Sequence, residues 1–250
     1  MDTSAILSLV LGAALAGFVQ GLSGFAFSLV AMSVWAWTID PRLAAVMAVF
    51  GGLTGQTIAA VTVRRGFDLA RLWPFLLGGI AGIPVGVLLL PLVEPDMFKA
   101  GLGILLAVWC PIMLFAPHLP PVRSGGSLAD GAIGLIGGVM GGFGGFTGVL
   151  PTLWCSLRRM DKDAQRSIVQ NFNLATLAAT MLGYVLAGNV TREMWPAFAI
   201  VAPAMLIPSL LGAKLYIGIS EQAFRRIVLS LLTLSGIALL ASSLPRLLGG

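Results

Sequence analysis

Charged residues divide the chain into long uncharged stretches. Eight of these stretches lie at 3–39, 43–63, 72–93, 100–122, 131–157, 167–191, 194–213 and 227–245. Six of the eight hold 19 to 25 residues, the length of one α-helix that crosses the ~30 Å hydrocarbon core at about 1.5 Å per residue. The pattern therefore predicts an all-α polytopic membrane protein.

The other two stretches, 3–39 and 131–157, are too long for a single crossing. They hold 37 and 27 residues and would run roughly 56 and 40 Å as straight helices. Both are interrupted by glycine, and nine glycines fall between Gly131 and Gly148. Such a run does not favour an unbroken helix. We expect each stretch to form a hairpin of two half-helices.

The two hairpin stretches open two similar halves. Gly17–Phe25 (GFVQGLSGF) aligns with Gly138–Phe146 (GVMGGFGGF), and three dipeptides further along the chain repeat in the same order. These are Trp73-Pro74 with Trp195-Pro196, Ile83-Pro84 with Ile207-Pro208, and Phe98-Lys99 with Phe224-Arg225. Matches that keep their order indicate an internal duplication.

The duplication predicts two repeats, residues 1–122 and 123–250. Each consists of one broken-helix hairpin and three transmembrane helices. The first repeat is expected to hold the hairpin 4–37 and the spans 43–63, 72–93 and 97–117. The second is expected to hold the hairpin 130–157 and the spans 167–189, 194–216 and 222–245.

Lysine and arginine set the expected orientation. With hairpins that enter and leave by one face, the 15 basic residues divide 11 to 4 between the two sides, whereas eight simple crossings divide them 6 to 9. The larger group is Arg64, Arg65, Arg71, Arg123, Arg158, Arg159, Lys162, Arg166, Lys214, Arg225 and Arg226. The smaller group is Arg42, Lys99, Arg192 and Arg246. The positive-inside rule favours the hairpins and makes the first side cytoplasmic. An odd number of crossings per half then predicts inverted repeats.

Composition supports a membrane protein and excludes soluble classes. Hydrophobic residues make up 58% of the chain, charged residues 10%, and the mean hydropathy is +0.97. Soluble domains carry roughly 25% charged residues, so soluble enzymes and nucleic-acid-binding proteins are excluded despite the pI of about 9.9. The expected surroundings are the lipid bilayer, with no nucleic acid partner.

The interruptions at 20–24 and 142–147 predict a binding site. Backbone that leaves helical geometry inside a membrane must be buried or line a watery cavity. Two helices that begin there point unpaired N–H groups and positive dipole ends inward, which suits an anion. The expected substrate-binding residues are Gln20, Ser23, Gly24, Phe25, Gln56, Gly144, Gly145, Thr147, Gln170 and Asn173. Two alternatives stay open: the glycines serve close helix packing, and the polar residues bond neighbouring helices.

The mutational expectations follow from this placement. A side chain at Gly145 is expected to push an anion away from the backbone, whereas Gly12, well before the break, is expected to tolerate a methyl group. Arg158 and Arg159 are expected to affect anion access rather than binding, because no basic residue lies within the eight stretches.

Several kinds of chemistry lack the residues they need. All ten acids lie beside segment boundaries, His118 is the single histidine, and there is no Walker A motif. A buried proton relay, ATP hydrolysis and hydrolytic catalysis are therefore not expected. Cys110 and Cys155 form no CxxC pair. No metal, no cofactor and no enzymatic activity are predicted.

The segment from Gly138 to Leu153 (GVMGGFGGFTGVLPTL) resembles the signature of the TauE/SafE family, and the segment Gln20–Phe25 occupies the place of its first-half copy. This family handles sulfite, sulfonates and related sulfur compounds. The resemblance covers nearly the whole chain and implies a sulfur-containing oxyanion as substrate. It also implies a multi-pass protein of the bacterial inner membrane.

Three classes of function remain after these steps. The first is a secondary transporter of a small anion that binds at the midplane between the two hairpins, with sulfite or an organosulfonate as the expected substrate. The alternative is a passive anion channel, which inverted repeats do not exclude. The third, a membrane enzyme or assembly subunit, lacks a catalytic constellation. A homo-oligomer is compatible with each of them.

Overall fold

The computed structural model describes residues 2–23, 26–62, 66, 68–122, 124–214 and 220–248. Over these residues the chain is all-helical, as predicted, with ten α-helices and no strand. They are α1 (Thr3–Ser23), α2 (Phe27–Trp35), α3 (Pro41–Thr62), α4 (Leu69–Leu89), α5 (Pro95–Phe115), α6 (Gly126–Gly144), α7 (Val149–Leu157), α8 (Lys162–Leu186), α9 (Trp195–Lys214) and α10 (Glu221–Leu248). Short 3-10 turns follow α4 and α5 and precede α9.

Seven of the described helices are long and apolar enough to cross a membrane: α1, α3, α4, α5, α6, α9 and α10. The protein is therefore a multi-pass membrane protein. The helices α2 and α7 have nine residues each, about 14 Å, which is too short to cross. The remaining helix, α8, has 25 residues but carries polar side chains on its buried face, among them Gln170 and Asn173.

The helices α1 and α2 form a hairpin, and so do α6 and α7. The indole N–H of Trp35, the last residue of α2, donates to the carbonyl of Ser8 near the start of α1 (3.0 Å). Likewise, Arg158 at the end of α7 binds Asp130 near the start of α6. In each pair the short helix thus returns the chain to the side where the long helix began. The arms are unequal, rather than two half-helices, because α1 and α6 have 21 and 19 residues.

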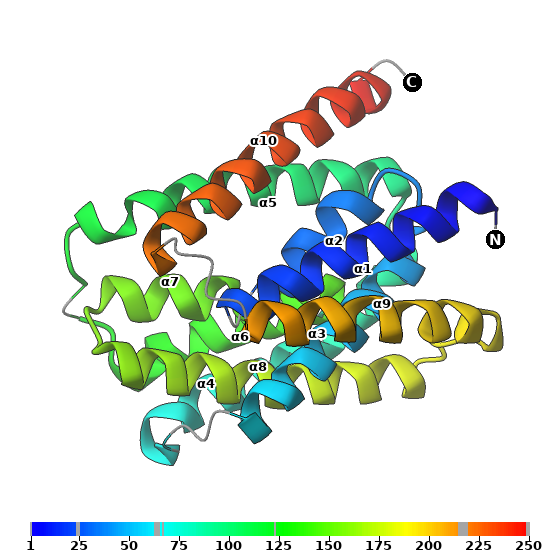
Figure 1. The fold of residues 1–250 in the computed structure, drawn as a ribbon. Helices are drawn as coiled ribbons and strands as arrows, with labels where there is room; N and C mark the ends of the chain where they lie inside the picture. The colour runs from blue at the N-terminus through cyan, green and yellow to red at the C-terminus, as the bar shows by residue number, and fades with distance from the viewer. Residues whose placement is uncertain are drawn as a thin grey trace.

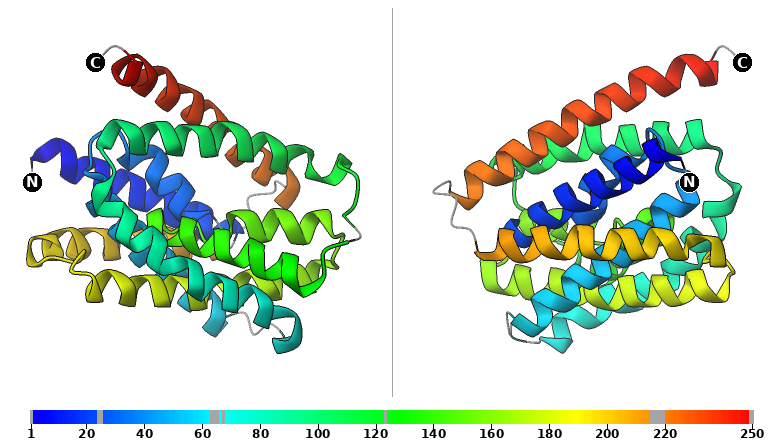
Figure 2. Two further views of the ribbon diagram at one scale, coloured as in Figure 1. Left: turned by 180° about the vertical axis from the view of Figure 1, so that it is seen from behind. Right: turned by 45° about the vertical axis from the view of Figure 1, so that its right-hand side comes forward.

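The long hairpin arms pack against helices from the other half of the chain. The most extensive helix pairs are α4 with α6, α1 with α9, and α5 with α10. Figures 1 and 2 show α1 lying along α9, and α10 crossing α5 at the edge of the bundle. If α1 corresponds to α6 and α4 to α9, the first two pairs are the same contact made twice.

Glycines allow these two contacts to be very close. A Cβ added at Gly17 of α1 would lie 2.4 Å from the Met205 carbonyl oxygen of α9. One added at Gly138 of α6 would lie 2.0 Å from the Gly79 carbonyl oxygen of α4. Gly17 and Gly138 are aligned positions of the duplicated motif. At these positions the glycines therefore serve helix packing, the alternative that the sequence left open.

Asp130 holds the two ends of the second hairpin together by binding a tryptophan of α7 and the arginine that follows this helix. Its carboxylate accepts two bonds from Nη1 of Arg158 (2.9 and 3.1 Å) and one from the indole N–H of Trp154 (2.7 Å). The Arg158 guanidinium also stacks over the Trp154 ring, 5.9 Å from its centroid. Because Arg158 is committed to this carboxylate, its expected role in attracting anions is not supported.

Candidate functional site

The interruptions in the two hairpins meet at one cavity. This central cavity is lined by Gln20 and residues 26–29 of the first hairpin and by residues 145–149 and Thr152 of the second. Helices α3, α5 and α8 complete the wall. About 50 Å³ is open to the centre of a water-sized sphere, several times the volume that holds one water. The space suits a ligand of a few heavy atoms.

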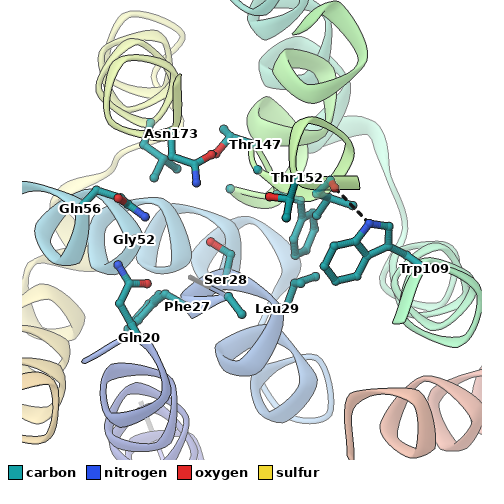
Figure 3. Close-up of a pocket in the computed structure, with 16 residues that line it drawn as sticks. Gln20, Phe27, Ser28, Leu29, Gly52, Gln56, Trp109, Thr147, Thr152 and Asn173 are labelled. Carbon is teal, nitrogen blue, oxygen red and sulfur yellow. Dashed lines mark hydrogen bonds between the residues drawn. The ribbon is translucent and has the colours of Figure 1, made fainter. Parts of the chain in front are cut away.

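Polar side chains from four directions converge on this space (Figure 3). Gln20 comes from α1, Ser28 from α2, Gln56 from α3 and Asn173 from α8, and all four are buried. Buried Thr147 donates its hydroxyl to Oδ1 of Asn173 (2.8 Å). That bond directs the amide N–H₂ of Asn173 toward the cavity in Figure 3. None of the described lining residues is charged.

Gln20 supplies an unused donor. Its side chain is 5% exposed, and its Nε2 has no hydrogen-bond partner among the described residues. The amide lies against Gly55 of α3, where an added Cβ would be 2.2 Å from Nε2. A buried amide donor without an acceptor costs about 1–3 kcal/mol. An acceptor atom bound in the cavity would remove that cost.

The two helices that start at the cavity differ in the donors they offer. The N-cap of α2 is Ala26, in the left-handed region (φ 73°), and no side chain caps this helix. The first N–H groups of α2 therefore have neither an intrahelical acceptor nor a side-chain cap. On α7, the Val149 N–H donates to the Phe146 carbonyl (3.3 Å), and Pro151 has no N–H. The start of α2 therefore has more backbone N–H groups without an acceptor in its own helix than the start of α7 has.

The α5 and α7 side of the cavity is mainly apolar, with Thr152 as a polar residue on it. Trp109 and Leu29 form the wall opposite the amides (Figure 3), together with Phe146 and Val149. The indole N–H of Trp109 donates to the Val149 carbonyl (3.0 Å), which fixes α5 to the first turn of α7. The cavity thus has a polar end at Gln20, Gln56 and Asn173 and an apolar end at Trp109.

The structure brings together half of the residues predicted to bind substrate. Gln20, Gln56, Gly145, Thr147 and Asn173 line the central cavity. Ser23 does not: its hydroxyl donates to the Val19 carbonyl of its own helix (2.6 Å). Gly144 and Gln170 are buried outside the lining. Gly24 and Phe25 lie outside the described residues.

Sequence reasoning missed Ser28, Gly52, Trp109 and Thr152, which also line the cavity. Ser28 and Thr152 lie in the first turns of α2 and α7, so the expected helix starts could have pointed to them. Gly52 lies one helical turn before Gln56 on α3, and that spacing was the available signal. Trp109 lies in an apolar helix, where no pattern distinguishes it from core residues.

The expectation that Gly12 tolerates a methyl group is wrong for a steric reason, and Gly145 is constrained by its backbone as well as by the cavity. A Cβ at Gly12 would lie 2.2 Å from Nε1 of Trp35, so Gly12 is part of the contact that closes the first hairpin. Gly145 has φ +76°, and a Cβ there would lie 2.7 Å from the Ser28 hydroxyl. A substitution at Gly145 therefore strains the backbone as well as filling the cavity.

Comparison with known proteins identifies the family. Residues 9–239 match the family model described as Sulfite exporter TauE/SafE. The chain belongs to the TauE/SafE family. Members of this family are membrane transporters, not enzymes, which fits a central cavity without charged groups. Searches of curated proteins and of solved structures found no match to this TauE/SafE chain.

Proposed function

We propose that this TauE/SafE protein is a secondary transporter of a small anion, sulfite or a short organosulfonate, that binds in the central cavity. The observation that carries the proposal is the meeting of two helix interruptions at a cavity of neutral hydrogen-bond donors. The uncapped start of α2 contributes N–H groups and a positive dipole end. Family membership supports the class of substrate.

The proposed binding mode places the anionic head near the start of α2. There, the Nε2 of Gln20 and the Ser28 hydroxyl, whose bond to the Ala48 carbonyl is long (3.4 Å), add side-chain donors to the backbone. The amides of Gln56 and Asn173 complete the polar end. Neutral donors bind an anion without holding it as tightly as a buried cation would, which favours release on either side.

Inverted repeats are the proposed basis of alternating access. The repeated contact of α1 with α9 and α6 with α4 supports this arrangement. So does the placement of the smaller basic group: Arg246 pairs with Asp96 (3.7 Å), and Arg42 bonds to Asn189 (3.1 Å). We propose that this end of the bundle, which also holds the N-terminus (Figure 1), faces outward from a bacterial inner membrane.

The test is anion flux through purified protein in liposomes. Sulfite, sulfoacetate, taurine, sulfate and acetate are offered one at a time, first as labelled substrate and then as the anion on the opposite side. A transporter gives saturable flux that is stimulated by substrate on the opposite side, whereas a channel gives single-channel currents. Absence of both for every anion contradicts the proposal.

Ser28→Ala adds a test of the site. Removing this hydroxyl should weaken sulfite binding by a few-fold, because the backbone donors of α2 remain. Thr233→Ala is the matched control, since the Thr233 hydroxyl on α10 bonds, within the described part of the chain, to the Leu229 carbonyl of its own helix (2.8 Å). Equal effects of the two changes would argue against the site.

A further inference from the structure

A second cavity lies at the end of the bundle that holds the N-terminus. This end cavity is lined by residues 36–40, which join α2 to α3, by Pro41 at the start of α3, and by Pro95, Phe98 and Lys99 of α5. About 240 Å³ of it is open to the centre of a water-sized sphere, against about 50 Å³ in the central cavity. It is large enough for a hydrated anion.

The same two helices flank both cavities. α2 starts at the central cavity with Phe27, and its C-cap residue Ala36 lines the end cavity. α5 reaches the end cavity with Lys99 and the central cavity with Trp109. Ten residues of helix separate the two α5 positions, roughly 15 Å. The two cavities are therefore separated by roughly 15 Å along α5, and α2 also runs from one to the other.

Lys99 gives the end cavity a cationic group, which the central cavity lacks. Its side chain is partly buried, and no ion pair of Lys99 is found among the described residues. The cavity also contains Asp40, but Oδ1 of this carboxylate accepts from the N–H groups of Arg42 and Leu43 (3.0 and 3.2 Å) at the start of α3. Nearby Asp96 pairs with Arg246.

From this arrangement we infer that the end cavity is a second anion site, where Lys99 binds sulfite or a sulfonate by its oxyanion before or after the central cavity. The inference rests on the proposed function for its place in transport. A long, flexible ammonium suits a transient site because it binds as a point charge and releases readily. Trp37, which is 44% exposed at the same cavity, provides an apolar surface for an organic substituent.

The first experiment does not depend on transport. Thr38→Cys places a thiol in the exposed wall of the end cavity, in a protein with Cys110→Ala and Cys155→Ala. Its rate of reaction is measured with a sulfonate-bearing and with a trimethylammonium-bearing thiosulfonate. Lys99→Gln should lower the anionic-to-cationic rate ratio by roughly 3- to 10-fold, the effect of losing local attraction. Methanesulfonate should slow the anionic reagent only when Lys99 is present.

The matched control is Arg246→Gln, which removes the same charge at the same end of the bundle but outside the cavity lining. An equal change in the rate ratio for the two variants would overturn the inference. So would a failure of methanesulfonate to protect the thiol.

Flux measurements then separate this inference from the proposed function. With sulfite offered at the Lys99 side, Lys99→Gln should raise the apparent KM about 3- to 10-fold at low salt and weaken its salt dependence, with little change in maximal rate. If the unaltered protein shows no saturable flux, the proposed function fails while the labelling result still decides the end cavity. If flux saturates but Lys99→Gln leaves KM unchanged, only the inference fails.

Discussion

Gly52→Ala is the cleanest perturbation that the central cavity offers. Gly52 lines the cavity from the middle of α3, and the nearest atoms to an added Cβ are Leu177 Cδ1 at 3.4 Å and Ser28 Oγ at 3.5 Å. These are ordinary van der Waals distances. The methyl group therefore enters the cavity without straining the backbone, unlike a side chain at Gly145.

The effects on stability and on binding have opposite signs. Replacing a mid-helix glycine by alanine stabilises a helix by roughly 0.5–1 kcal/mol. The same methyl group occupies part of a space of about 50 Å³ and stands beside the Ser28 hydroxyl. If the anion loses one charge-assisted hydrogen bond, about 1.5–3 kcal/mol of binding is lost, or roughly ten- to a hundredfold in affinity.

The assay pairs thermal unfolding in detergent with the sulfite concentration that half-saturates flux. Gly52→Ala should unfold at the same or a higher temperature and should need at least tenfold more sulfite. Gly101→Ala on α5 is the control, because nothing lies within 4 Å of an added Cβ there. A Gly52→Ala protein that is stable and transports normally would refute the placement of the anion in this cavity.

Three further predictions concern the frame around the site. Asp130→Asn or Arg158→Gln alone should destabilise the protein by about 3 kcal/mol, because each leaves a largely buried charge unpaired; the double variant should unfold at a higher temperature than either. Gly12→Ala should lower the unfolding temperature by displacing the indole at the end of α2. A cysteine at Asp2 should react with an impermeant reagent added outside, while one at Arg159 should not; labelling of both from one side would contradict the proposed inverted repeats.

The positions of the helices could be predicted from the sequence because each long uncharged stretch consists of many apolar residues that all indicate the same helix. The ends of each predicted span lie within five residues of the ends of the corresponding helix, because charges and prolines mark the boundaries of long apolar runs. The unequal hairpin arms were not predictable from the uncharged stretch 3–39. Helix length there depends on how far α1 packs along α9, a contact between residues nearly 200 positions apart.

The candidate site was predictable only in part, because a polar residue near a helix break has several possible partners. Gln20 and Asn173 face the cavity, but Ser23 turns back to the Val19 carbonyl. Whether a side chain faces the cavity or its own helix depends on how the helix is rotated about its axis. The pattern of polar residues in the sequence does not determine that rotation to within one residue. Trp109 was hidden for another reason: its neighbours along the chain are apolar too.

The proposed duplication accounts for the packing of this protein better than it accounts for the site. The aligned glycines Gly17 and Gly138 make equivalent close contacts, and such contacts suit helices that slide or rock against one another. The two helix starts, however, offer different donors. Pro151 of α7 has no N–H, whereas the first N–H groups of α2 lack an intrahelical acceptor and Ser28 lies beside them. Two equivalent helix starts would favour an ion such as sulfate, whose oxygen atoms are distributed evenly around its centre. One polar and one apolar end favour an anion with a distinct head, so an alkylsulfonate should compete for the central cavity better than sulfate does.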